Sequence, residues 1–168
     1  MFFTVFVLAG ATLGFRLLGA LGVRRFAAWP VSAAHGMAVL LLVTASAHFV
    51  PAGTSLPMPS HDDLVAMVPP VIPFPSFVVY LTGVLELLGA AGLVLAATRR
   101  AAGYALAVLF VAMFPANVYA ALAGGGATPL WVRTPEQVLF IGVALWATRG
   151  AAALPSALPH SAGAGRQG

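Results

Sequence analysis

Long runs of apolar residues, separated by short polar stretches, dominate the pattern along the chain. Five runs are near the ~20 residues that a helix needs to cross a bilayer, and they cover residues 2–22, 32–50, 74–97, 101–122 and 136–149. Strands of a transmembrane barrel would alternate apolar and polar residues instead. The pattern therefore predicts an all-α membrane protein with five transmembrane helices.

Composition also indicates a lipid environment. Hydrophobic residues make up 61% of the 168 residues and charged residues only 7%, whereas soluble domains carry about 25% charged residues. So little charge cannot cover a globular surface in water, and we expect the lipid bilayer to surround the chain. The sequence has no cysteine, which excludes dithiol redox chemistry, covalent haem attachment and cysteine-ligated iron–sulfur clusters within it.

The basic residues indicate how the helices are oriented, because arginines collect at the cytoplasmic ends of membrane spans. With the N-terminus outside and the C-terminus in the cytoplasm, the cytoplasmic side receives Arg24, Arg25, Arg99, Arg100 and Arg149. The other side receives Asp62, Asp63, Glu136 and only Arg133. Since the arginines end apolar runs and do not form one polar face, we expect no nucleic-acid partner.

Residues 1–25 are predicted to be a retained N-terminal span. A signal peptide has basic residues before its apolar core, and here Arg24 and Arg25 follow the core. Arg16 lies within the run, and two interpretations of it stay open. Its side chain could reach the headgroups along the membrane surface, or it could be the counter-charge of a buried carboxylate in another span.

The long connection at residues 51–73 is predicted to be an external loop that contains a short amphipathic helix. Ser60 and Asp63 have the spacing of a helix-capping pair, and Pro69-Pro70 ends the helix. The acidic residues are interpreted as a cap and a solvated face. A metal site of His61, Asp62 and Asp63 is the alternative for this segment.

Glu86 is the most informative residue of the third span. It follows Phe74 by twelve positions, which places it about 18 Å into a hydrocarbon layer of about 30 Å. A carboxylate at that depth is costly unless it faces the bundle interior and is protonated or paired. In the fourth span Pro115 predicts a kink, and Asn117 would need a hydrogen-bond partner.

The last span is predicted to begin with Thr134 as its cap, Pro135 in the first helical position and Glu136 in the first turn. Residues 150–168 show no pattern that could pack, and we expect a disordered cytoplasmic tail.

Polar residues from several spans fall in the outer half of the predicted bundle and suggest a pocket that opens outward. In this hypothesis Glu86 and His48 are the catalytic groups and exchange protons. The predicted ligand-binding residues are Asn117, Tyr119, Arg133, Gln137 and Tyr80. A quinone or another amphiphilic ligand would suit such a site. The alternative is a hydrogen-bonded network that only holds the helices together.

Several of these motifs occur in an order that resembles the DoxX-like family of small bacterial membrane proteins. They are Ala45-x-x-His48-Phe49, Met67-Val68-Pro69-Pro70, Val79-Tyr80-Leu81-x-Gly83-x-x-Glu86, Thr98-Arg99-Arg100-x-Ala102-Gly103, Phe114-Pro115-Ala116-Asn117-x-Tyr119 and Arg133-x-Pro135-x-Gln137. Ala45 stands where that family usually has glycine, and Glu136 where it has an apolar residue.

The resemblance implies a four-helix transmembrane bundle at residues 32–149, with residues 1–25 as an added helix, in the inner (plasma) membrane of a bacterium. It also implies association with quinone-linked oxidation and with oxidoreductase partner proteins. The resulting hypothesis is a membrane subunit of a redox or quinone-linked system. A non-catalytic scaffold and a small-molecule transporter, the latter as a homo-oligomer, are the alternatives, and whether the protein is an enzyme stays open.

Overall fold

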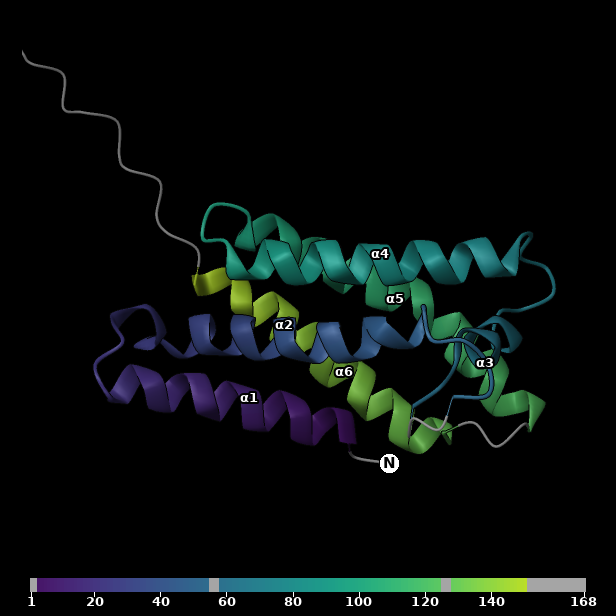
Figure 1. Ribbon diagram of the computed structural model, residues 1–168, viewed down its shortest axis with the longest axis horizontal. Coiled ribbons are helices and arrows are strands. Elements are labelled where there is room, and N and C mark those ends of the chain that lie inside the picture. Colours follow the sequence, from purple (N-terminus) through teal and green to yellow (C-terminus); the bar gives the residue numbers. More distant parts are fainter. Residues whose placement is uncertain (1–2, 55–57, 125–127, 151–168) are drawn as a thin grey trace, which may run out of the picture.

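The structure, a computed structural model, describes residues 3–54, 58–124 and 128–150, and all regular secondary structure in these ranges is helical (Figure 1). The elements in chain order are α1 (Phe3–Ala20), η1 (Arg24–Phe26), α2 (Trp29–Ala47), α3 (His61–Ala66), α4 (Pro75–Val94), α5 (Arg99–Ala123), α6 (Leu130–Ala147) and η2 (Thr148–Gly150). The predicted all-α class is confirmed. Gly150 ends η2, and the rest of the tail predicted to be disordered lies outside the described residues.

Four of the described helices, α1, α2, α4 and α5, are long and apolar enough to cross a membrane. These four correspond to the first four predicted spans. The fifth predicted span corresponds to α6, which has 18 residues but carries Arg133, Glu136 and Gln137 in its first half. The sequence pattern therefore located every long helix, and α6 differs from the others in its polar beginning.

Four helices form a closed ring in which α2 and α5 each pack against both α4 and α6. In consequence α4 and α6 occupy opposite corners of the ring. Helix α1 lies outside the ring and packs along α2 (Figure 1). Leu8 is the fully buried residue of α1, whereas α2 buries residues around its whole circumference. Helix α2 is thus the centre of the molecule, and α1 exposes most of its apolar surface.

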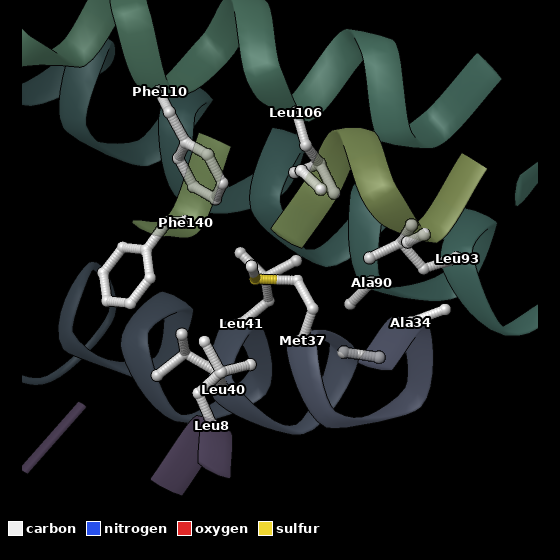
Figure 2. Close-up of a cluster of buried hydrophobic side chains, with 13 residues drawn as sticks. Leu8, Ala34, Met37, Leu40, Leu41, Ala90, Leu93, Leu106, Phe110 and Phe140 are labelled. Carbon is white, nitrogen blue, oxygen red and sulfur yellow. The ribbon is translucent and has the colours of Figure 1, made fainter. Parts of the chain in front are cut away.

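The core fills the middle of the ring with large aliphatic and aromatic side chains (Figure 2). Met37, Leu40 and Leu41 of α2 meet Leu106 of α5 and the rings of α5 and α6 there. The Phe110 and Phe140 ring centroids are 6.2 Å apart. This packed layer separates the two ends of the bundle, which differ in chemistry.

The arginine end of the bundle is defined here by Arg24, Arg25, Arg99, Arg100 and Arg149, which the helix directions bring to the same end. Arg99 is buried at this end, and its guanidinium donates to the carbonyls of Leu93 (2.7 Å), Val94 (3.1 Å) and Gly150 (2.6 Å). Arg25 donates to the same Val94 carbonyl at 2.8 Å. Arg99 therefore caps the C-terminal end of α4 and joins it to η2.

Arg16 also points toward the arginine end, where its guanidinium carbon lies 5.4 Å from the centroid of the Trp29 ring. This cation–π contact favours the interpretation of Arg16 as a residue of the membrane surface. Glu86 has a different partner, His48.

The predicted start of the last span is wrong. Helix α6 begins at Leu130 with Pro129 as its N-cap residue, and Pro135 lies inside the helix. Thr134 therefore does not cap it. Val132 is 3% exposed, so the apolar residues before Arg133 gain burial by joining the helix, and that burial outweighs the local signal of the Thr134-Pro135 pair.

Candidate functional site

His48 and Glu86 form a buried pair at the end of the bundle where α3 lies, called the α3 end below. His48 directly follows α2 and Glu86 belongs to α4. His48 is 5% exposed and Glu86 is 4% exposed. The His48 Nε2 atom lies 3.7 Å from Glu86 Oε1. The sequence placed both groups in the outer half of the bundle, and the structure brings them into contact.

Backbone contacts fix the orientation of the His48 ring. Its Nδ1 donates to the carbonyl of Val79 at 2.7 Å, which leaves Nε2 to face Glu86. Gly83 makes room for this arrangement, because a Cβ added there would lie 2.6 Å from the His48 Cβ. The glycine in this position therefore lets α4 approach the end of α2 closely enough for the pair to form.

Thr44 completes the surroundings of Glu86. Its hydroxyl donates to Glu86 Oε2 at 2.8 Å, while Oε1 faces His48. Both carboxylate oxygens thus have a polar neighbour, as a buried acid requires. The distance of 3.7 Å between His48 and Glu86 exceeds that of a hydrogen bond, so His48 Nε2 has no direct bond to the carboxylate and can contact a ligand.

A cavity of about 470 Å³ surrounds this pair at the α3 end of the ring. Most of its lining is apolar, and Leu64, Met67 and Val68 from α3 and the turn after it cover one side. The polar side chains in the lining come from α1, α2, α4, α5, α6 and the segment before α6. They are Thr4, Thr44, His48, Thr82, Glu86, Asn117, Thr128, Arg133, Glu136 and Gln137. An apolar cavity with a few polar groups is typical of a small-molecule site.

The cavity includes some of the predicted ligand-binding residues and leaves out others. Asn117, Arg133 and Gln137 line it, and Gln137 also donates to the Phe110 carbonyl of α5. Tyr80 and Tyr119, although both are within the described ranges, do not belong to the lining. Tyr80 stacks on His61 instead, with 4.1 Å between the ring centroids, because the pitch of α4 turns it toward α3.

Glu136 and Thr4 are site residues that the sequence analysis missed. Glu136 is 5% exposed and lines the cavity. It accepts a hydrogen bond from Thr4 of α1 at 2.7 Å, and its Oε2 lies 3.7 Å from Arg133. Had the helix start been placed at Leu130, the spacing of Arg133 and Glu136 would have predicted their contact. No signal in the sequence connects Thr4 to Glu136.

His61 links α3 to the end of α2 and the beginning of α4. It is buried, its Nδ1 donates to the His48 carbonyl at 2.8 Å, and its Nε2 accepts from the Ser76 hydroxyl at 2.9 Å. Within the described residues no group of three or more His, Cys, Asp or Glu side chains could hold a metal ion. His61, Asp62 and Asp63 do not form such a group in this structure, because the His61 ring faces inward and bonds to His48 and Ser76.

The predicted helix cap at Ser60 and Asp63 is confirmed. Asp63 accepts from the backbone N–H of Ser60 at 2.8 Å and from its hydroxyl at 2.7 Å, and the Asp63 N–H donates back to that hydroxyl at 3.3 Å. These bonds to the charged form, first the one from the Ser60 backbone, lower the pKa of Asp63 below its ordinary value.

Comparison with known proteins gives one result. A family model described as a domain of unknown function (DUF8561) matches residues 37–151. No curated protein and no solved structure matches the chain. The matched region begins within α2 and contains the whole of α3 to α6, so it includes His48 and Glu86 and does not include α1. Because the model covers more than half of the chain, the protein belongs to the DUF8561 family.

Proposed function

We propose that the protein is a five-span protein of the inner membrane, with its N-terminus outside and its C-terminus in the cytoplasm. Two observations support this orientation. The arginine end carries five arginines, whereas the acids of α3 lie at the opposite end. Basic residues at the cytoplasmic side are the strongest topological signal in such proteins. In this orientation the cavity at the α3 end lies in the outer half of the bilayer.

The orientation can be tested with single cysteines, because the natural chain has none. Thr54→Cys lies in an exposed segment at the α3 end and Ala28→Cys in an exposed segment at the arginine end. A maleimide that cannot cross membranes is expected to label Thr54→Cys in spheroplasts and Ala28→Cys only after lysis. The reverse pattern, or labelling of both before lysis, would contradict the orientation.

For the cavity we propose the binding of a quinone or a similar amphiphile, as part of a membrane subunit of a redox or quinone-linked system. The buried His48–Glu86 pair in a largely apolar cavity is the observation that carries this proposal. The apolar lining suits the ring and tail of the ligand, while the pair and its polar neighbours suit its oxygens. The resemblance to the DoxX-like family agrees with this function and extends the proposal to oxidoreductase partners that would supply the electrons.

His48 and Glu86 would bind the ligand by donating a hydrogen bond from whichever of the two carries a proton. A proton on either His48 Nε2 or Glu86 would allow the group that carries it to donate a hydrogen bond to a ligand oxygen. Thr44 donates to Glu86 Oε2, so Oε1 is the oxygen that faces His48 and is left for a ligand. Asn117 and Arg133 line the same cavity and add further donors to oxygen.

Purification in mild detergent, followed by mass spectrometry of the extracted small molecules, tests this function. The natural protein is expected to carry a quinone, and Glu86→Gln is expected to lose it, because the substitution keeps the shape and removes the titrating group. Tyr119→Phe is the matched control, since Tyr119 lies outside the lining. An empty natural protein, or a Glu86→Gln variant that retains the quinone, would contradict the proposal.

A scaffold is the second candidate, and the polar contacts that join helices favour it. Gln137 of α6 bonds to the backbone of α5, and His61 bonds to both the end of α2 and the beginning of α4. If Glu86→Gln changes only the thermal stability of the purified protein, these residues hold the bundle and do not serve a ligand.

A further inference from the structure

The first turn of α1 forms part of the cavity wall, although α1 lies outside the four-helix ring and outside the family match. Phe3 and Thr4 line the cavity, and the rest of α1 packs along α2. The hydroxyl of Thr4 donates to Glu136 Oε1 at 2.7 Å, a length typical of a hydroxyl bonded to a carboxylate. The added helix therefore reaches a buried acid that the family region alone leaves without this donor.

Glu136 has the same kinds of neighbours as Glu86. Each carboxylate accepts a hydrogen bond from a threonine hydroxyl, Thr4 in one case and Thr44 in the other. Each also lies 3.7 Å from a basic nitrogen, of Arg133 for Glu136 and of His48 for Glu86. Both carboxylates are at most 5% exposed and line the same cavity.

The two acids stand on different walls. Glu86 belongs to α4 and Glu136 to α6, and these helices occupy opposite corners of the ring because each packs against both α2 and α5. The lining of the cavity thus includes two acids that come from different helices, with mostly apolar side chains around them. A ligand with one oxygen group would leave one buried acid without a ligand contact, whereas a ligand with an oxygen at each end of a ring would contact both.

We propose that Thr4 positions Glu136 as a second polar end of the cavity, and that the ligand carries an oxygen function at each end, as a 1,4-quinone or 1,4-hydroquinone ring does. The inference rests on the proposed ligand-binding function and adds the chemical class and a role for α1. Thr4 is a positioning residue, since it acts on the ligand through Glu136.

Equilibrium binding of two probes to the purified protein in detergent tests the inference. One probe is an alkyl-1,4-hydroquinone with two ring oxygens, and the other is the alkylphenol of the same chain length with one. The natural protein is expected to bind the hydroquinone about tenfold more tightly, because a hydrogen bond to a charged group is worth about this factor. Thr4→Val is expected to abolish most of that preference and leave phenol binding unchanged.

Two control variants separate positioning from packing. Thr4→Ser keeps the hydroxyl and is expected to keep the preference. Thr12→Val makes the same chemical change in the middle of α1, where Thr12 packs against Gly36 of α2, and is also expected to keep it. If Thr4→Val weakens both probes equally, Thr4 is only part of the wall and the inference is wrong.

The outcomes also distinguish this inference from the proposed function. One outcome is that Glu86→Gln abolishes hydroquinone binding while Thr4→Val leaves it unchanged. This result would contradict the role of Glu136 as a second polar end and would leave the proposed function in place. Equal affinity of the natural protein for the two probes would also contradict the second polar end. If the natural protein binds neither probe, both proposals fail.

Discussion

The two ends of the bundle both bury charged side chains, but they satisfy them in different ways. At the arginine end, Arg99 donates to three backbone carbonyls and joins α4 to η2. At the α3 end, Glu86 and Glu136 meet threonine hydroxyls and basic side chains around a cavity. The donors of Arg99 are used by the protein itself, whereas the carboxylates at the α3 end line a cavity, for which we propose proton exchange with a bound ligand. Burial of a charge does not by itself indicate a binding site, because Arg99 is equally buried and acts within the fold.

Removal of the Arg99 side chain is expected to give the largest effect on stability. Arg99→Ala removes the side-chain donor from the carbonyls of Leu93 and Gly150, while Val94 keeps the bond from Arg25, and we expect the substitution to lower the free energy of unfolding by about 2–4 kcal/mol. Thermal unfolding in detergent measures the change. Arg100→Ala is the matched control, because Arg100 is exposed and the next residue in the same helix. Equal losses from the two variants would show that Arg99 does not act as the cap of α4.

A substitution at the other end should separate stability from binding. Glu86→Gln can still accept the hydrogen bond from Thr44 and can donate toward His48, so we expect a change in unfolding free energy of less than about 1 kcal/mol. The same variant is expected to lose the bound quinone, while Arg99→Ala keeps it where the protein is still folded. A loss of stability as large as that of Arg99→Ala would remove the contrast between the two ends.

The smallest effect is expected at the helix cap of α3. The pKa of Asp63 is lowered in the folded protein by its bonds from Ser60, so its contribution is present above the unfolded value of 3.8 and is lost as the pH falls through the folded pKa. We expect residues 61–66 to lose protection from hydrogen–deuterium exchange in that acidic range, after correction for intrinsic rates. Asp63→Asn is expected to show this lower protection at neutral pH, whereas Asp62→Asn keeps it. Unchanged protection in Asp63→Asn would contradict the role of the cap.

Local signals predicted much of the fold correctly. The apolar runs located every long helix in the described ranges, and Ser60 with Asp63 marked the beginning of α3. These features depend on neighbours in the sequence, because helix periodicity and caps involve residues only a few positions apart. The start of α6 was misplaced for the opposite reason, since Val132 gains its burial from other helices.

The candidate site was predictable only in part. Glu86 and His48 were identified because an acid deep in an apolar run and a histidine near the end of another are unusual. Tyr80 was predicted to bind the ligand but stacks on His61, and a helix position alone cannot tell which neighbour a side chain faces. Thr44 is a common residue in an apolar helix, so nothing marked it as the donor to Glu86.

By itself the sequence determined the helical class and the presence of helices long and apolar enough to cross a membrane, because both follow from the average polarity of the segments and their length. It also identified a costly acid that needs a partner. The tertiary structure decided which groups meet, namely His48 with Glu86, Thr4 with Glu136, and Arg99 with the carbonyls at the end of α4. These contacts join residues far apart in the chain, so they depend on how the helices are rotated and spaced in the bundle. Rotation and spacing are set by packing over whole helix faces, down to single glycines such as Gly83.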